Sequence, residues 1–192
     1  MNNTIKMVLL GDSTSGKTTL VNRFAYGTCK NNYPTTIGCG FIKKRVEING
    51  KFINIDIWDT SGQERYSDIL PMYYRYAAIA IIVYDITNKK SFKTAINWIK
   101  TLRDDNINTH IILYGNKTDL DEIRVIDKIK KDFFTDKKIY IIDGSALYDK
   151  NVNKSIFDVL SKMDLNFYLE RKNENIDISN NNNEKIRYNC CY

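Results

Sequence analysis

The fold of this chain is decided by the stretch Gly11-Asp12-Ser13-Thr14-Ser15-Gly16-Lys17-Thr18, which fits the pattern G-x-x-x-x-G-K-[S/T] at every defined position. An apolar run at residues 5–10 precedes it, and a helical pattern over residues 17–26 follows it. This order of buried strand, loop and helix suits a phosphate-binding loop, because main-chain N–H groups and a helix N-terminus then converge on phosphate oxygens. We expect Lys17 to bridge the outer phosphates and the Thr18 hydroxyl to bind Mg²⁺.

Two positions inside this loop, Thr14 and Ser15, carry side chains where glycine is frequent. Such side chains can be accommodated if their φ angles stay negative and their β-carbons point outward, and we expect both conditions to hold. The alternative is a Ser/Gly turn that only caps the helix. The nucleotide-binding residues predicted in and next to the loop are Ser13, Thr14, Ser15, Gly16, Lys17, Thr18 and Thr19.

The rest of the chain alternates β-rich runs with helical patterns. Residues 41–48 and 51–58 alternate apolar and polar side chains around Asn49-Gly50, a strong hairpin signal, whereas residues 28–40 are typical of a loop. Further buried strands are predicted at 78–84, 110–114 and 138–142, and helices at 91–103, 123–134 and 152–170. The alternation indicates a doubly wound α/β sheet, in which ligands bind at the carboxyl ends of the strands.

Composition agrees with one compact domain and a short tail. Of the 192 residues, 43% are hydrophobic and 27% are charged, which is ordinary globular usage for a chain able to bury a sizeable core. The longest apolar run, residues 77–84, is too short for a membrane span of about 18 residues. Residues 1–6 do not resemble a secretory leader, so we expect a cytosolic protein. The predicted division is a domain over residues 1–170 and an Asn-rich, disordered tail over residues 171–192.

Charge and cysteine usage exclude several functions. The net charge of +6 is modest and scattered, and without a base-reading or aromatic-stacking motif it predicts no nucleic-acid partner. Four cysteines are present: Cys29, Cys39, Cys190 and Cys191. Neither pair has the spacing of a metal knuckle, and we expect no structural disulfide in a reducing compartment.

The segment Asn116-Lys117-Thr118-Asp119 indicates which base is bound. It follows a predicted strand, so it belongs to the same sheet edge as the phosphate loop. The Asp119 carboxylate can accept hydrogen bonds from N1–H and the exocyclic amine of guanine, a donor pair that adenine lacks. Two alternatives are a surface turn without a ligand and an ATP-dependent phosphoryl transferase, although the latter should lack this segment.

Three further segments complete the predicted site. After the strand over residues 54–58, Asp59 can hold Mg²⁺, the Gly62 N–H can reach a γ-phosphate, and Gln63 can orient the attacking water. Thr36 is expected to close over the γ-phosphate and Mg²⁺. The predicted catalytic residues are therefore Gln63, Lys17 and Thr36, and the predicted metal ligands are Thr18, Thr36 and Asp59. Main-chain N–H groups of Ser145, Ala146 and Leu147 are expected to back the guanine.

Taken together, these segments resemble the Ras superfamily and closely resemble its Rab branch. The resemblance lies in residues 11–18, 36–41 (Thr-Ile-Gly-Cys-Gly-Phe), 57–66 (Ile-Trp-Asp-Thr-Ser-Gly-Gln-Glu-Arg-Tyr), 73–75 (Tyr-Tyr-Arg) and 84–87 (Tyr-Asp-Ile-Thr). It implies a small G-domain of the phosphate-loop NTPase type, with a six-stranded, mostly parallel sheet, one antiparallel strand and helices on both faces. It also implies a GTPase that binds GTP, GDP and Mg²⁺. Residues 71–75 with Asn97-Trp98 are most similar to the early-endosomal, endocytic Rab subgroup.

The resemblance further implies a switch in vesicle or endosomal trafficking. The expected partners are a guanine nucleotide exchange factor, a GTPase-activating protein, effectors, a Rab escort protein and a GDP-dissociation inhibitor, and the expected state is a monomer. Cys190 and Cys191 resemble a double geranylgeranylation site, which predicts attachment to the cytoplasmic face of an endosomal or vesicular membrane. Two exposed thiols on a flexible tail are the alternative. Because Asn189 stands where a C-a-a-X motif needs cysteine, that motif is absent.

The chain departs from the family pattern next to the base. Leu147 stands where a lysine usually lies along the base, and Cys29 stands where an aromatic ring often stacks on guanine. Both changes predict a looser grip on the base and faster nucleotide exchange. Together with Thr14 and Ser15, Leu147 also motivates an alternative function, a GTP-binding scaffold with negligible hydrolysis.

Overall fold

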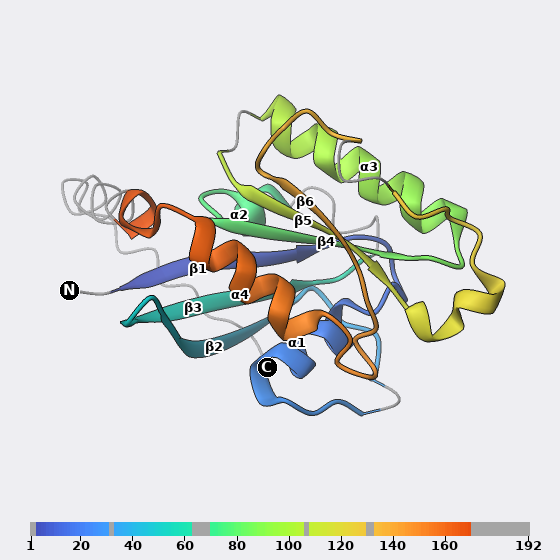
Figure 1. The fold of residues 1–192 in the computed structure, drawn as a ribbon, viewed down its shortest axis with the longest axis horizontal. Coiled ribbons are helices and arrows are strands. Elements are labelled where there is room, and N and C mark those ends of the chain that lie inside the picture. Colours follow the sequence, from blue (N-terminus) through green and yellow to red (C-terminus); the bar gives the residue numbers. More distant parts are fainter. Residues whose placement is uncertain (1–2, 31–32, 63–69, 106–107, 130–132, 170–192) are drawn as a thin grey trace.

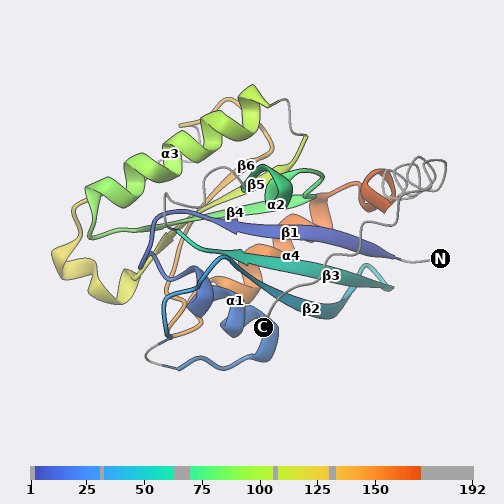
Figure 2. The same cartoon turned by 180° about the vertical axis from the view of Figure 1, so that it is seen from behind.

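A computed structural model describes residues 3–30, 33–62, 70–105, 108–129 and 133–169 of the 192. In this part of the chain, six strands form one sheet that lies between two layers of helices (Figures 1 and 2). The strands are β1 (Thr4–Leu10), β2 (Cys39–Ile48), β3 (Lys51–Thr60), β4 (Ile79–Asp85), β5 (His110–Asn116) and β6 (Ile139–Asp143). The helices are α1 (Lys17–Tyr26), α2 (Leu70–Tyr74), α3 (Lys89–Asp104), the short 3₁₀ helix η2 (Thr118–Ile123) and α4 (Val152–Lys162).

The strand order β2-β3-β1-β4-β5-β6 confirms the predicted fold class. Among the described strands, β2 and β3 pair antiparallel, and every other neighbouring pair is parallel. The carboxyl ends of the parallel strands therefore meet at one edge. Strand β1 lies in the middle, with β3 on one side and β4 on the other, so the loop that leaves β1 begins where the topology switches direction. Such a switch point is where open α/β sheets bind their ligands.

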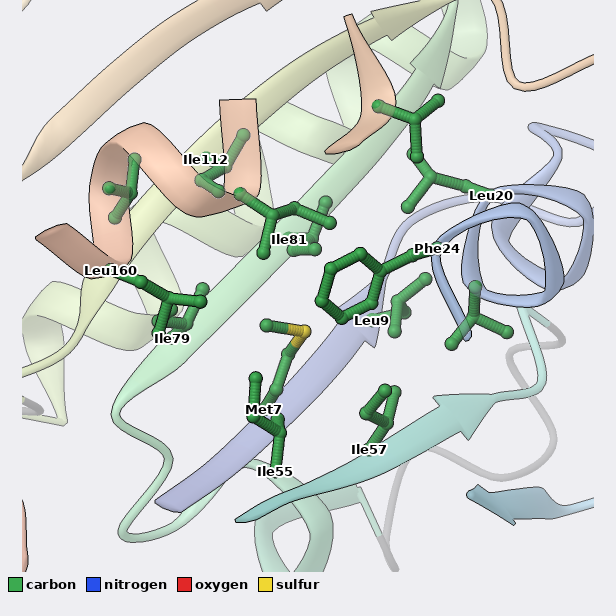
Figure 3. Packing of buried hydrophobic residues seen from close by; sticks show 14 of the residues in the cluster. Met7, Leu9, Leu20, Phe24, Ile55, Ile57, Ile79, Ile81, Ile112 and Leu160 are labelled. Atoms are coloured by element: carbon green, nitrogen blue, oxygen red, sulfur yellow. The ribbon is translucent and has the colours of Figure 1, made fainter. Parts of the chain in front are cut away.

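Strand β1 shows why the sheet is covered on both faces. Its alternate residues point to opposite sides: Met7 and Leu9 pack in the cluster that includes α1 and α4, whereas Val8 and Leu10 pack in the cluster that includes α2 and α3. All four side chains are fully buried. Figure 3 shows Phe24 of α1 lying over Met7 and Leu9 in the first of these clusters. A run without polar interruptions is what a strand buried on both faces requires.

The hairpin of β2 and β3 forms as predicted around Asn49-Gly50. Both turn residues have positive φ, 50° at Asn49 and 75° at Gly50, which is the signature of a type I′ turn. On the inner face of β2, Lys44 Nζ donates to Phe24 O at 2.5 Å and to Ala25 O at 3.2 Å. These are carbonyls from the last turn of α1, where a cation is favourable. Strand β2 is thereby tied to the end of α1.

One predicted helix, over residues 123–134, is wrong where the structure describes that segment. The 3₁₀ helix ends at Ile123, and Arg124 has extended dihedrals (φ −60°, ψ 132°). The N–H groups of Val125 and Ile126 both donate to Ile86 O, so they cannot serve a helical ladder. Ile126 is nevertheless buried. The apolar spacing therefore indicated residues that face the core, and an irregular segment delivers them instead of a helix.

The last predicted helix, over residues 152–170, is too long. Helix α4 ends at Lys162, because Met163 adopts extended dihedrals (φ −77°, ψ 145°). Helix resumes over residues 165–169, where Asp164 Oδ1 accepts from Phe167 N at 3.4 Å in the manner of an N-cap.

Helix α2 was not predicted, although Leu70 and Tyr74, one turn apart, are its buried residues. Among the residues that the structure describes, no helix combines the length and apolar character needed to cross a bilayer.

Candidate functional site

A cavity of about 460 Å³ opens at the carboxyl edge of the sheet. Its size lies within the usual range of small-molecule sites. The walls come from the phosphate loop and the start of α1, from the loops before β2 and after β3, and from the loops after β5 and β6. The lining residues are Ser13, Thr14, Gly16, Lys17, Thr18, Thr19, Tyr33, Pro34, Thr35, Thr36, Thr60, Gly62, Asn116, Lys117, Asp119, Leu120, Ser145, Ala146 and Leu147.

The phosphate loop wraps closely enough to require glycine at both of its defined glycine positions. Gly11 has φ 132° and Gly16 has φ 95°, and both values favour glycine. A β-carbon on Gly11 would collide with Val83 O, and one on Gly16 would collide with the side-chain amide of Asn116. Because α1 begins at Lys17, the first main-chain N–H groups of this helix face the cavity without intrahelical partners. Such an arrangement suits an anion.

Thr14 corrects the expectation of negative φ angles in the loop. Its φ is 63°, which is unusual for a β-branched residue. Its side chain is exposed, as expected, so the β-carbon avoids the inside of the loop. For Ser15 the φ angle is not positive, as expected, but the side chain does not point outward. Only 1% of the residue is exposed, and its Oγ has no hydrogen-bond partner among the described residues. The loop therefore keeps its shape with a strained threonine and an inward serine.

Lys17 supplies a buried positive charge at the base of the cavity. The residue is 6% exposed, and its Nζ donates to Gly11 O at 3.2 Å and to Asp12 O at 2.8 Å. Burial lowers the pKa of Lys17 to about 8, although the carboxylates of Asp59 and Asp12 act in the opposite direction. Two neutral carbonyls only partly compensate a buried ammonium. The site is therefore electrostatically suited to a polyphosphate.

Three oxygen-bearing side chains gather beside Lys17. Thr18 Oγ1 donates to Asp59 Oδ2 at 2.7 Å, and Thr36 Oγ1 lies 2.9 Å from Thr18 Oγ1 and 3.5 Å from Asp59 Oδ2. Burial raises the pKa of Asp59, while hydrogen bonds from Thr18 and the charge of Lys17 oppose the rise. The other carboxylate oxygen, Oδ1, is buried and has no partner in the described part of the chain. Hydroxyl and carboxylate oxygens of this kind fit Mg²⁺.

On the other side of the phosphate loop, Asn116 joins two loops. Its Nδ2 donates to Ser15 O at 2.8 Å, and its Oδ1 accepts from Ala146 N at 2.9 Å. Nearby, Asp119 Oδ1 accepts from Ser145 Oγ at 2.5 Å. Asp119 therefore has a fixed orientation at the cavity wall, where a carboxylate can receive the paired donors of a guanine base.

Comparison with known proteins agrees with this geometry. A family model described as the Ras family matches residues 6–165. The Ras-related protein Rab5A of Oryza sativa subsp. japonica is 39% identical over 160 residues, which cover 82% of this chain and 79% of the relative. The Ras-related protein Rab5 of Nicotiana tabacum is 38% identical over 160 residues, which cover 82% of this chain and 80% of the relative.

The chain belongs to the Ras family. Members of the Ras family bind GTP and GDP together with Mg²⁺, and they hydrolyse GTP, so this chain is a small GTPase. The structure brings all the described residues of the predicted site to one edge of its sheet. Gln63, Cys190 and Cys191 lie outside the described residues.

Asp85 is a residue of this Ras-family site that was missed in the sequence, although its partner Lys117 was predicted. Lys117 Nζ pairs with Asp85 Oδ2 at 2.6 Å, and Lys117 itself has a positive φ of 68°. Burial tends to raise the pKa of Asp85, but hydrogen bonds from Lys117 and Thr87 outweigh it, and the pKa is lowered. Because Asp85 ends β4 at the same edge, its position could have suggested this role. Tyr33, Pro34 and Leu120 line the cavity without a motif that would have identified them.

The two departures from the family pattern differ in their placement. Leu147 lines the cavity, as expected for a residue next to the base. Cys29 is not among the described lining residues, and its Sγ instead lies 3.5 Å from Leu147 O, behind the loop. Ser145 N–H is also turned away, because it donates to Lys150 O at 3.0 Å. The N–H of Ala146 is engaged as well, because it donates to Asn116 Oδ1 at 2.9 Å. Two of the three N–H groups expected to back the guanine therefore have protein acceptors in this structure.

Proposed function

We propose that this Ras-family GTPase is a Rab-type switch in vesicle or endosomal membrane trafficking. The likeness to two plant Rab5 proteins over most of the chain supports this role. In this proposal residues 1–170 form the catalytic domain and residues 171–192 form a tail that carries the lipid anchor. The chain would alternate between a GTP-bound form that binds effectors and a GDP-bound form that does not.

In the proposed site, different side chains bind the phosphates, the Mg²⁺ ion, the attacking water and the base. Lys17 neutralises charge on the outer phosphates, and Thr18, Thr36 and Asp59 would hold Mg²⁺. When bound, this ion neutralises charge that develops on the phosphate oxygens. Gln63 is proposed to orient the attacking water. Asn116, Lys117 and Asp119 fix the base side, backed by the loop over residues 145–147.

Two loops connect the phosphate end of the site to the surface. Thr36, in the loop before β2, contacts Thr18 through its hydroxyl at 2.9 Å. Gly62, in the loop after β3, lies so close to Ser13 N and Lys17 Nζ that a β-carbon would collide with both. A bound γ-phosphate would therefore be sensed by both loops, and its loss would release them.

An aromatic surface next to Thr36 supports effector binding. Ile37 is 83% exposed, and beyond it the rings of Phe41 and Trp58 lie 4.9 Å apart, with Tyr73 of α2 5.6 Å from Trp58. These rings come from β2, β3 and α2, so their arrangement depends on both loops that flank the phosphate end. Phe41 is 46% exposed, whereas Trp58 and Tyr73 are half-buried. A contiguous aromatic group that reaches the surface in this way favours a protein partner. We propose that effectors read the nucleotide state here.

Membrane attachment is proposed to use Cys190 and Cys191. Two geranylgeranyl chains would anchor the protein firmly, because each buried methylene contributes about 0.8 kcal/mol and one lipid chain alone binds only marginally. A Rab escort protein and a GDP-dissociation inhibitor would then present and extract the lipidated chain, and exchange and GTPase-activating factors would set its cycle. We place the active form on the cytoplasmic face of an endosomal or vesicular membrane.

The observation that carries this proposal is the cluster of Thr18, Thr36 and Asp59 beside the buried Lys17. Single-turnover hydrolysis of GTP by the purified chain tests the chemistry, and Gln63→Leu should slow hydrolysis while leaving GDP binding intact. Unchanged hydrolysis in that variant would contradict the role of Gln63.

Localisation of a fluorescently tagged chain in cells tests the trafficking role. The parent should mark endosomes or vesicles, and a variant with Cys190→Ser and Cys191→Ser should be diffuse. Membrane localisation of the double variant would remove the proposed anchor.

A further inference from the structure

One arginine on α1 reaches three separate parts of the chain. Arg23 Nη1 donates to Gly27 O at 2.8 Å, just beyond the helix. Its Nη2 lies 2.9 Å from Cys29 Sγ, and the same nitrogen donates to Leu147 O at 2.5 Å. Its Nε donates to Ala146 O at 3.2 Å. The guanidinium therefore uses all three of its nitrogens, and two of them contact the base-side loop, which lies more than 120 positions away in the sequence.

This base-side loop, residues 145–147, is held from two directions. On the inner side Asn116 Oδ1 accepts the N–H of Ala146 at 2.9 Å. On the outer side Arg23 binds the carbonyls of Ala146 and Leu147. An arginine suits this position because its planar, permanently charged fork can serve neighbouring acceptors at once, whereas an ammonium acts as a point charge.

The position of the base-side loop matters because few other side chains are available to hold the base where this loop faces it. Leu147 offers no charge, and Cys29 offers no ring and lies behind the loop with its Sγ 3.8 Å from Ala146 O. Arg23 stands on the same helix whose first residues, Lys17 and Thr18, face the phosphates. It therefore fixes the distance between the helix that carries the phosphate site and the loop that faces the base.

We propose that Arg23 is a positioning residue for nucleotide retention: it holds the base-side loop against α1 and so keeps Ala146 and Leu147 in contact range of the bound base. This inference rests on the proposed guanine-nucleotide site. Arg23 does not line the cavity, so its effect is exerted through the loop rather than by touching the nucleotide.

The test is the release rate of fluorescently labelled GDP from the full chain with Arg23→Met, which keeps the length of the side chain but loses its donors. We expect release to accelerate about tenfold or more, because hydrogen bonds from a charged group are lost. Arg23→Lys should give an intermediate rate and serves as the second variant if Arg23→Met does not fold. The matched control is Arg45→Met on β2, where Arg45 lies over the Phe52 ring at 4.4 Å and outside the cavity. Its release rate should stay within about twofold of the parent.

A second readout separates positioning from general destabilisation. Release is measured with excess Mg²⁺ and again with EDTA, and the acceleration caused by Arg23→Met should be similar in both, because the loop lies apart from Thr18 and Asp59. Release at the parent rate in Arg23→Met would overturn the inference and leave the proposed nucleotide site standing. An acceleration that disappears in EDTA would also overturn it, because the effect would then belong to the metal side. A parent chain that binds no labelled GDP would overturn both.

Discussion

Asn116 Nδ2 donates a hydrogen bond of 2.8 Å to the main-chain oxygen of Ser15, 101 positions earlier in the chain. This contact fixes the phosphate loop relative to the end of β5, where the residues expected to face the base begin. Because the same amide group also accepts from Ala146 N, a single side chain sets the spacing of both halves of the site.

Replacing Asn116 with alanine should therefore loosen the nucleotide at both ends. Two buried main-chain groups would lose their partner, each at a cost of about 1–3 kcal/mol, so release of labelled GDP should accelerate by at least about tenfold. Asn153→Ala is the matched control, since Asn153 lies on α4 and bonds to Asp149. Equal release rates in the two variants would argue against the role of Asn116.

Replacing Thr18 with valine should raise the Mg²⁺ requirement for nucleotide retention. The variant keeps the shape of the side chain but removes the hydroxyl that lies 2.7 Å from Asp59 Oδ2. The Mg²⁺ concentration that half-maximally slows GDP release should rise by about tenfold or more, because a hard cation needs oxygen ligands. Thr94→Val on α3 should leave the Mg²⁺ dependence unchanged. A parent-like Mg²⁺ titration of Thr18→Val would contradict the assignment of Thr18 as a ligand.

Replacing Gly62 with alanine should slow GTP hydrolysis more than it weakens GDP binding. A β-carbon there would collide with the main chain at Ser13 N and Asp12 C, so the loop that leads to Gln63 must move away from the phosphate end. We expect single-turnover hydrolysis to fall about tenfold or more, with GDP affinity changed less than about threefold. Gly40→Ala is the control, because its β-carbon would meet Asp59 Cβ at an ordinary 3.7 Å. Hydrolysis that falls equally in both variants would show that the collision is not the cause.

Replacing Thr14 with glycine should stabilise the chain. Thr14 has a φ of 63°, and a left-handed conformation costs a non-glycine residue about 1 kcal/mol or more. Part of that gain is offset because glycine makes the unfolded chain more flexible. The net expectation is an increase of roughly 0.5 kcal/mol in the free energy of unfolding, measured by urea denaturation at fixed GDP and Mg²⁺. Thr101→Gly, inside α3, should instead lower the free energy of unfolding by roughly 0.3 kcal/mol, the difference in helix propensity between the two residues. A loss of stability in Thr14→Gly would mean that the loop carries no strain at this residue.

His110 makes the stability of the domain depend on pH. Burial lowers its pKa to about 4, and the positive charges of Lys138 and Arg103 act in the same direction against an opposing Asp136. Nδ1 also lies 3.1 Å from the hydroxyl of Tyr140. Between pH 6.5 and 4 the unfolded chain binds more protons than the folded one, so stability falls as the pH drops through this window.

At pH 5 this effect should cost about 1–2 kcal/mol relative to neutral pH. His110→Phe keeps a ring beside Tyr140 and removes the titrating group, so its free energy of unfolding should fall less steeply between pH 6.5 and 5. Urea denaturation across this range measures the difference. Identical slopes in parent and variant would assign the acid sensitivity to other groups.

Much of the fold and the site could be predicted from the sequence because strong local signals coincide with the site. At positions 11 and 16 the loop leaves no room for a β-carbon, and only glycine meets that requirement. At Asn49-Gly50 the hairpin turn needs positive φ angles, which these two residue types adopt readily. In both cases the residue type itself reveals the local structure. The helix predicted over residues 123–134 was wrong because apolar spacing indicates only which residues are buried. The N–H groups of Val125 and Ile126 donate to Ile86 O, and no local sequence pattern reveals that pairing.

The contacts of Arg23 could not be predicted for a similar reason. Its acceptors on Ala146 and Leu147 lie more than 120 positions away, and a single sequence gives no sign of such pairs. The pairing of Asp85 with Lys117 was missed although Asp85 ends β4 and Lys117 follows β5 at the same sheet edge. The φ angle of Thr14 has the opposite sign to the one expected, because β-branched residues ordinarily avoid positive φ and Thr14 does not. Local strain of this kind is tolerated at binding sites where the surrounding structure enforces it.

The bond from Lys44 to the final carbonyls of α1 limits how far a nucleotide-dependent change can travel. The loop that carries Thr36 leaves α1 at Gly27 and enters β2 at Cys39, and Lys44 joins these two elements just beyond the loop. When the loop that carries Thr36 changes conformation, its two ends should therefore keep their separation, because Lys44 holds β2 to the end of α1. The turn of the β2–β3 hairpin should keep its position while the loop before β2 changes shape. We therefore expect the effect of the bound nucleotide to stay confined to the loops at the carboxyl edge of the sheet.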